Sequence, residues 1–457
     1  TKERQPQRRA VGYGLTTREG FEGRSGHDYT ITQVALNHSA GFRHGEVWSL
    51  GMAWSGNNIA HVERLIDSHK SIGAGEYLLP GEIILSKGHT YKAPRAVASF
   101  SDRGLDGLTN NHYSWIRSRA GHITKRKPRP LTLNMWEAIY FQHDEKKVRE
   151  LVDIASEIGV ERVVLDDGWF GSRRSDRSGL GDWKVSPAMW PNGLSGIVDY
   201  VVSKNMQFGL WFEGEMVNPD SDLYRNHPEW ILSEGSRIPP LWRNELVLDL
   251  TNQSAFSYVL ENISKVIAEN EVDYIKWDHN RVLIDAGSNE RAAYVAQTRA
   301  IYSLFDELKQ RHNGLEIESC ASGGARIDLG MVDHVDRFWV SDNNDALERQ
   351  HIQRWTSQFL PLEVLGSHIG PTPSHQTGRK LELSFRAATA LFGHAGIEWD
   401  ITTLSSEEKH QLAEWISYYK AKRDLIHSGD VIRIDYPDSA TNLYGVVARD
   451  KRAALFI

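Results

Sequence analysis

The sequence has one cysteine and lacks long apolar runs. Because Cys320 has no second cysteine to pair with, no disulfide can form within the chain. No apolar run approaches the roughly 20 residues that a membrane helix needs, and residues 1–30 are polar and arginine-rich, without the apolar core of a signal peptide. We therefore expect a cytoplasmic protein without a membrane partner. We also expect truncation at both ends, since the chain begins at Thr1 and stops within the apolar run Ala453–Ile457.

Motifs for metals and nucleotides are missing as well. There is no HExxH, no calcium-loop spacing, no GxGxxG and no GxxxxGK[ST], and the 19 histidines are scattered. No nucleophile elbow suggests a Ser–His triad. We therefore expect neither a metal nor another cofactor. The net charge of −7, from 53 basic and 60 acidic residues, also argues against a nucleic-acid partner.

The chain is instead rich in tryptophan, and several of its 15 tryptophans lie beside acids. Aromatic faces stack on the C–H faces of sugars, and carboxylates accept hydrogen bonds from hydroxyl groups. The alternative is that the tryptophans belong to the core and that the acids cap strand ends. The pairs are Trp136-Glu137, Asp166-Asp167-Gly168-Trp169, Asp182-Trp183, Trp277-Asp278 and Trp399-Asp400.

Residues 1–125 have the pattern of a β domain. Short apolar stretches alternate with Gly, Asn, Ser and Pro, as in Tyr29–Thr32, Glu46–Leu50 and Ile83–Leu85. We predict a partial N-terminal β-sandwich here, without its first strands. The basic, proline-containing segment Arg126–Pro130 is interpreted as a linker, and residues 426–457 as the beginning of a C-terminal β-sheet domain.

Residues 126–425 alternate strands with amphipathic helices, which predicts a (β/α)8 barrel, the catalytic domain, of the usual size, ~250 residues or more. The helices are clearest at Asp144–Ile158, followed by Gly159 as the C′ residue, at Ser254–Asn270 and at Ser405–Lys422. The eight predicted strands are Leu131–Trp136, Arg162–Asp167, Phe208–Glu213, Asp273–Asp278, Glu316–Cys320, Phe338–Asp342, Leu362–Ser367 and His394–Trp399.

A barrel of this kind carries its active site at the C-terminal ends of its strands. Here almost every strand finishes on an acid, a tryptophan or another reactive side chain, which indicates a site at this face. The strand ends are Trp136-Glu137, Asp166-Asp167, Trp211-Phe212-Glu213, Lys276-Trp277-Asp278, Ser319-Cys320, Ser341-Asp342, His368 and Trp399-Asp400.

Asp278 and Asp342 are the candidate pair for glycoside hydrolysis, which uses two carboxylates. Side chains alternate along a strand, so Lys276 and Asp278 share a face, and the lysine would keep the aspartate ionised as a nucleophile. The apolar run before Asp342 could keep that residue protonated as the general acid. The alternatives are a structural Lys276–Asp278 ion pair, and an Asx turn or helix N-cap at Asp342.

The neighbouring acids Asp166 and Asp167 repel each other and need donors. Sugar hydroxyls and Arg243 could supply these donors, whereas the alternative is a divalent-metal site. The absence of metal-binding motifs argues against that alternative.

Six ordered motifs resemble the glycoside hydrolase family 36 α-galactosidases, and the resemblance covers essentially the whole chain. The motifs are Arg129-Pro130 through Asn134-Met135-Trp136-Glu137-Ala138, Leu165-Asp166-Asp167-Gly168-Trp169-Phe170-Gly171, Gly209-Leu210-Trp211-Phe212-Glu213, Tyr274-Ile275-Lys276-Trp277-Asp278-His279-Asn280-Arg281, Glu318-Ser319-Cys320-Ala321-Ser322-Gly323-Gly324 and Trp339-Val340-Ser341-Asp342-Asn343-Asn344-Asp345.

The resemblance implies a retaining α-galactosidase without cofactors, acting on substrates such as melibiose and raffinose. Asp278 would be the nucleophile and Asp342 the acid/base. Asp166 and Asp167 would bind the O4 and O6 hydroxyls, and Arg349 would orient the acid/base region. The remaining substrate-binding residues implied are Trp136, Trp211, Arg243, Lys276, Cys320 and Gly323. A homotetramer of the full-length protein is also implied.

Three alternatives to α-galactoside hydrolysis remain at this stage. They are galactosyl transfer of the raffinose- or stachyose-synthase type, specificity for α-N-acetylgalactosamine, and a non-catalytic sugar-binding barrel. The catalytic interpretation further predicts that the carboxyl groups of Asp278 and Asp342 lie within roughly 5–7 Å of each other.

Overall fold

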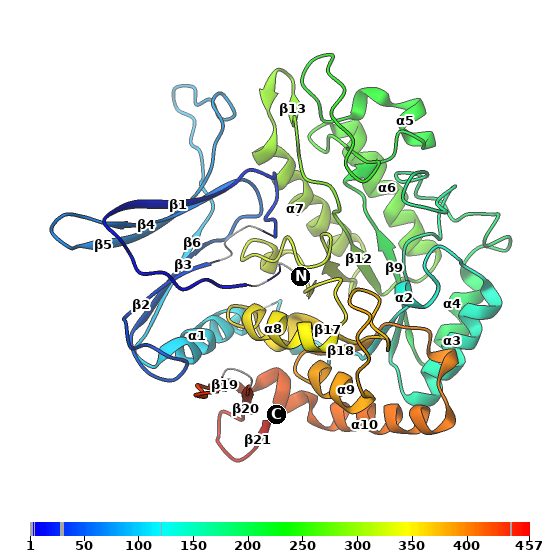
Figure 1. The fold of residues 1–457 in the computed structure, drawn as a ribbon. Helices are drawn as coiled ribbons and strands as arrows, with labels where there is room; N and C mark the ends of the chain where they lie inside the picture. Colours follow the sequence, from blue (N-terminus) through cyan, green and yellow to red (C-terminus); the bar gives the residue numbers. More distant parts are fainter. Residues whose placement is uncertain (1–2, 4, 28–31, 120, 439–440) are drawn as a thin grey trace.

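The computed structural model describes residues 1–457 except 1–2, 4, 28–31, 120 and 439–440. Its centre is a closed barrel of parallel strands, seen on the right of Figure 1, in which β18 pairs with β7 to complete the ring. The predicted (β/α)8 barrel is therefore confirmed. In order around the barrel, the strands are β7 (Thr132–Asn134), β8 (Arg162–Leu165), β9 (Gln207–Phe212), β12 (Tyr274–Trp277), β15 (Glu316–Ser319), β16 (Arg337–Trp339), β17 (Leu365–Ile369) and β18 (His394–Ile397).

Helices cover the outside of the barrel and connect its strands, except that β15 and β16 are joined through a short 3-10 turn. The helix predicted from Asp144 is α3. At its start, the Asp144 side chain accepts a hydrogen bond from the backbone N of Lys147, and at its end Gly159 has a φ of 93°. This is the conformation that glycine adopts without strain at a helix end. The outer helices are α3 (Glu145–Ile158), α4 (Ser195–Ser203), α6 (Gln253–Glu269), α7 (Tyr294–Arg311), α8 (Ala346–Thr356), α9 (Leu383–Leu391) and α10 (Ser406–Ser428).

Two local predictions around the barrel were wrong. Leu362–Ser367 does not form one strand, because Leu362–Val364 is a 3-10 turn and β17 begins only at Leu365. Arg126–Pro130 is not a free linker, because Arg129 is fully buried and its guanidinium lies 2.7 Å from the Glu316 carboxylate. The charge of a basic segment can thus be neutralised inside the barrel, which composition alone does not reveal.

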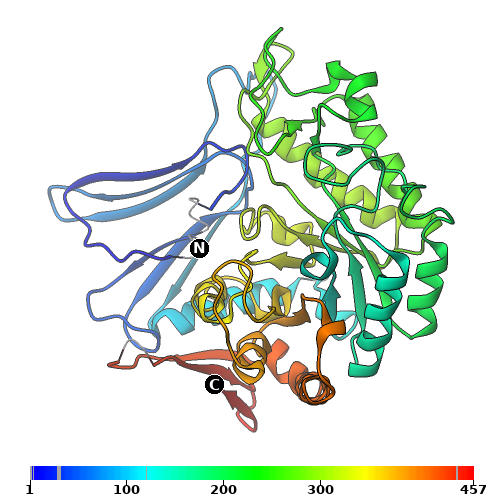
Figure 2. The ribbon, with the colours of Figure 1, turned by 45° about the vertical axis from the view of Figure 1, so that its right-hand side comes forward.

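The N-terminal region forms two antiparallel sheets, which lie beside the barrel on the left of Figure 2. One contains β1 (Gly14–Gly20), β4 (Asn58–Arg64) and β5 (Lys70–Glu76), and the other contains β2 (Thr32–Leu36), β3 (Val47–Met52) and β6 (Ala96–Ser101). The strand predicted at Glu46–Leu50 is thus β3. Most of the stretch Tyr29–Thr32 lies outside the described residues, and Ile83–Leu85 is not in a strand.

The region predicted as β also contains a 15-residue helix, α1 (Gly104–Ser118). Its residues Leu105, Leu108, His112 and Ile116 are buried at helical spacing, a pattern that the sequence reasoning missed. The helix contacts β3, β6 and β19 (Asp430–Ile434). It therefore connects the β2–β3–β6 sheet to the C-terminal end of the chain.

The C-terminal β prediction is borne out by a small antiparallel sheet of β19 (Asp430–Ile434), β20 (Leu443–Val447) and β21 (Ala454–Phe456). An ion pair at 2.8 Å between Arg433 and Asp106 joins this sheet to α1. Within the described part of the chain, none of the helices has the length and apolar character that crossing a bilayer requires.

Candidate active site

Asp278 lies just beyond the C-terminal end of β12 and is 8% exposed. Its Oδ1 accepts a hydrogen bond from the backbone N of His279 at 2.8 Å, and its Oδ2 accepts from Asn280 Nδ2 at 2.8 Å and from Trp211 Nε1 at 3.3 Å. Donors that converge on both oxygens fix the orientation of the carboxylate and favour its charged form.

The pKa of Asp278 is lowered in spite of burial, which on its own would raise it. The positive charges of Lys276 and Arg243 and the hydrogen bonds from Asn280 and His279 together outweigh the loss of solvent. Asp278 is therefore ionised at neutral pH, as a nucleophilic carboxylate must be.

Lys276 shares the inward face of β12 with Asp278, but its ion-pair partner is Asp166. The Lys276 Nζ lies 2.8 Å from Asp166 Oδ2, which also accepts from Asn134 Nδ2 at 2.7 Å. The alternative of a closed structural pair between Lys276 and Asp278 is thus wrong. Lys276 lowers the pKa of Asp278 through its charge while its ion pair holds the Asp166 carboxylate in place.

Asp167 is paired with a residue that the sequence reasoning did not select. Two nitrogens of Arg173 donate hydrogen bonds to the Asp167 carboxylate, Nε at 3.0 Å and Nη2 at 2.8 Å. Arg243 was expected to relieve the repulsion between the two acids, but its Nη1 donates instead to Asn280 Oδ1 at 2.9 Å. Arg243 therefore contributes to the surroundings of Asp278, whereas Asp166 and Asp167 have separate cationic partners.

Asp342 follows β16 and accepts a hydrogen bond from Trp339 Nε1 at 2.8 Å. The residue still meets solvent at the mouth of the barrel. Partial loss of hydration, followed by the negative charge of Asp278, raises the pKa of Asp342 to about 6. The helix N-cap alternative is wrong, because Asp345 caps α8 by accepting from the N–H groups of Leu347 and Glu348.

Arg349 and Gly323 lie around Asp342. The Arg349 guanidinium donates to the carbonyl oxygens of Ser341 and Asn343 and lies 4.5 Å from the ring centre of Trp339. Gly323 has φ 82°, and a Cβ there would come within 2.7 Å of the Asp342 backbone N. Only glycine allows this close approach.

The other predicted site residues lie at the same face of the barrel. Trp136 is half-buried and packs edge-on against Tyr140 and Phe141. Trp211 was expected to form an aromatic wall, but it is 2% exposed and offers its indole N–H to Asp278. Cys320 is buried, and burial raises the pKa of its thiol well above the usual value.

Two further polar residues were not selected from the sequence. Asn280 continues the alternation of Lys276 and Asp278 along the chain, and this spacing could have identified it. Glu398 is buried and lies 2.8 Å from His368 Nδ1, whereas the neighbouring Asp400, expected at the strand end, pairs with Lys147 on α3. The described residues contain no group of three His, Cys, Asp or Glu side chains that could hold a metal ion.

Comparison with known proteins identifies the family of this chain. The melibiase family matches residues 90–429, and the N-terminal domain of glycosyl hydrolase family 36 matches residues 1–86. Among curated relatives, the chain is 41% identical over 457 residues to an α-galactosidase of Escherichia coli and 36% identical over 445 residues to AgaA of Geobacillus stearothermophilus. These alignments cover 100% and 95% of this chain but 64% and 61% of the relatives.

Solved structures also match α-galactosidases of glycoside hydrolase family 36. The crystal structure of the family 36 α-galactosidase AgaA superposes with a TM-score of 0.95 at 35% identity, covering 98% of this chain and 64% of AgaA. An AgaA variant in complex with stachyose superposes with a TM-score of 0.96 at 35% identity, covering 99% and 64% of the two chains. This chain therefore belongs to the melibiase family, within glycoside hydrolase family 36.

Proposed function

We propose that this chain carries the catalytic barrel of a retaining α-galactosidase. The substrates would be terminal α-D-galactosyl residues of galacto-oligosaccharides such as melibiose and raffinose. The observation that supports this most is the opposite shift of two carboxyl groups at one barrel face. The pKa of Asp278 is lowered, whereas that of Asp342 is raised to about 6. One ionised and one protonated carboxyl group are what a double displacement requires.

In the first step, a carboxylate oxygen of Asp278 attacks the anomeric carbon while Asp342 gives its proton to the departing glycosidic oxygen. This forms a β-galactosyl ester on Asp278 and releases the aglycone. In the second step, the Asp342 carboxylate removes a proton from water, the resulting oxygen attacks the anomeric carbon, and the ester bond to Asp278 breaks. Galactose leaves with its original α configuration, and both carboxyl groups return to their starting states.

Recognition of galactose is assigned to the pair Asp166 and Asp167. Asp166 is fixed by Lys276 and Asn134, and Asp167 by the fork of Arg173, so neither carboxylate needs to reorganise when hydroxyls bind. The α-galactosidase names of the relatives, and the AgaA complexes with raffinose and stachyose, agree with this substrate class.

Labelling with a 2-deoxy-2-fluoro-galactosyl reagent tests the proposal, because the fluorine slows hydrolysis of the covalent intermediate. Trypsin would separate the two candidates, with Asp278 in the peptide Trp277–Arg281 and Asp342 in Phe338–Arg349. We expect the galactosyl mass on Trp277–Arg281 only, and no label on Asp278→Asn. A label on Phe338–Arg349, or an intact protein that is never labelled although it binds galactose, would contradict the double displacement.

A further inference from the structure

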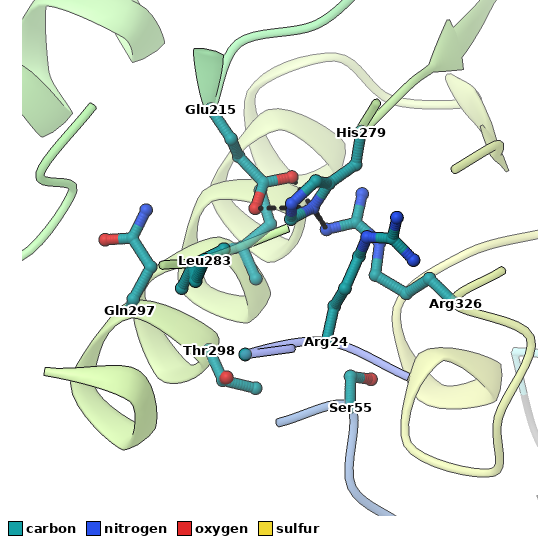
Figure 3. A pocket seen from close by; sticks show the side chains of 10 residues that line it. Arg24, Ser55, Glu215, His279, Leu283, Gln297, Thr298 and Arg326 are labelled. Carbon is teal, nitrogen blue, oxygen red and sulfur yellow. Dashed lines mark hydrogen bonds and ion pairs between the residues drawn. The ribbon is translucent and has the colours of Figure 1, made fainter. Parts of the chain in front are cut away.

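A small cavity lies behind the nucleophile, between the N-terminal region and the barrel (Figure 3). Gly23, Arg24 and Ser55 come from the N-terminal side, and the barrel contributes Glu215, His279 and Arg326. The backbone N of His279 donates to Asp278, so the cavity touches the segment that holds the nucleophile. None of these side chains has a part in the proposed reaction.

Two buried guanidinium groups meet at this cavity. Arg24 is 4% exposed and Arg326 is 2% exposed, and Figure 3 shows their heads next to each other. Burial, and then the charge of Arg326 on Arg24, lower the pKa of Arg24 to about 10. At neutral pH both groups still carry their charge, which a buried environment tolerates only when anions balance it.

The single negative charge of the buried Glu215 carboxylate is not enough to balance the two positive charges of Arg24 and Arg326. Its Oε1 accepts from Trp277 Nε1 at 2.9 Å and from Arg326 Nη1 at 2.7 Å, so this carboxylate is committed to Arg326. The acid nearest to Arg24 is Glu22, at 3.8 Å and 39% exposed. Among the described residues, the negative charges that act on Arg24 are Glu22 at 3.8 Å and, at longer range, Asp278 and Glu215, of which Glu215 is already paired with Arg326.

Several N–H groups at the cavity also lack acceptors. Arg24 Nε, Arg326 Nε and Arg326 Nη2 are buried without a hydrogen-bond partner among the described residues, as is His279 Nε2. Arginine can only donate, so the three unpartnered arginine nitrogens are donors, whereas His279 Nδ1 lies 2.9 Å from Arg326 Nη1 and 3.4 Å from Glu215 Oε2. The cavity is therefore surrounded by donors and by excess positive charge.

We propose that this cavity binds a single halide ion, with chloride as the halide available in cells. The free space accommodates about one water-sized particle, which is too little for phosphate, sulfate or a carboxylate. A water molecule would fit, but it carries no charge and accepts only two hydrogen bonds. A halide accepts from every direction and supplies the missing negative charge.

Thermal unfolding of the protein in sodium chloride, compared with sodium gluconate at the same ionic strength, tests the site. Gluconate is too large for the cavity, so we expect the Tm to rise with chloride concentration beyond the gluconate value. In Arg24→Gln, the loss of a charge-assisted donor should weaken the apparent chloride affinity about tenfold or more. The matched control is Arg299→Gln, since Arg299 is exposed on α7, whose residues Gln297 and Thr298 line the cavity.

An equal Tm in the two salts would overturn the proposal, and so would a chloride effect that persists unchanged in Arg24→Gln. Because that variant could fail to fold, anomalous diffraction from wild-type crystals grown in sodium bromide gives an independent answer. A bromide peak within hydrogen-bond distance of Arg24 and Arg326 supports the site, whereas water density without an anomalous peak refutes it. Neither measurement depends on galactosidase activity, so the halide site can fail while the proposed function stands.

Discussion

Asn280 offers a sharp test of how Asp278, the proposed nucleophile, is kept ionised. Its Nδ2 donates to Asp278 Oδ2 at 2.8 Å, and its Oδ1 accepts from Arg243 Nη1 at 2.9 Å and from Ser322 Oγ at 3.1 Å. These contacts fix which end of the amide faces the nucleophile. We predict that Asn280→Ala raises the pKa of Asp278, because a hydrogen bond to the charged form is lost while burial remains.

The size of the shift follows from the interaction that is removed. A hydrogen bond to a charged group contributes about 1.5–3 kcal/mol, and one pKa unit corresponds to about 1.4 kcal/mol. The pKa of Asp278 should therefore rise by roughly one to two units. The donors His279 N and Trp211 Nε1 remain in the variant, so the lower half of this range is the more direct expectation.

The assay is the pH profile of kcat/KM with an aryl α-galactoside. Protonation of Asp278 in the free protein sets the acid limb, so this limb should move to higher pH in Asn280→Ala. Glu213, the other carboxylate bound by Asn280, cannot imitate the shift, because burial and then Asp278 raise its pKa to about 8. Asn262→Ala, on the outer helix α6, controls for general destabilisation. An acid limb that stays in place, with or without loss of rate, would refute the reasoning.

Two further predictions concern Asp342 and the base of the barrel. A pKa of about 6 for Asp342 places the alkaline limb of kcat/KM near pH 6. Asp342→Asn should remove this limb, and it should slow the hydrolysis of raffinose more than that of substrates with good aryl leaving groups. An equal loss of rate on both kinds of substrate would argue against the acid role. Glu316 lies 2.7 Å from Arg129 and 2.8 Å from Arg162, all fully buried. Glu316→Gln should lower the free energy of unfolding, measured with urea at neutral pH, by about 3–5 kcal/mol. The exposed control Glu261→Gln should lower it by less than about 1 kcal/mol. Similar losses in the two variants would contradict the prediction.

The Glu316 effect should also depend on pH. Burial raises the pKa of this carboxyl group, but Arg129 and Arg162 more than compensate and hold it well below the ordinary value. The stabilisation is therefore present above the pKa of about 4.3 for an unfolded glutamate and is lost as the pH falls through the folded value. The stability difference between the wild type and Glu316→Gln should shrink in acid.

The order of strands and helices was available from the sequence because each barrel strand is a short apolar run and each outer helix has a clear apolar face. Asp144 and Gly159 even marked both ends of α3. The position of Asp278 was available for the same reason, since the alternation along β12 puts it on the face of Lys276. Local pattern determines local structure, and the known geometry of a barrel then locates the site.

The pairing of charges was decided only by the tertiary structure. Lys276 could have neutralised Asp278, two residues away, but β8, which lies two strands away from β12 in the barrel, brings Asp166 within 2.8 Å. Arg173, six residues beyond Asp167, took the place expected for Arg243. Arg129 in an apparent linker became part of the barrel interior. Ion pairs are short-range and weakly coded by sequence separation, so partners appear only when the strands are assembled. The sequence by itself determined the barrel and the positions of the proposed catalytic acids, whereas folding decided which cations pair with the buried acids.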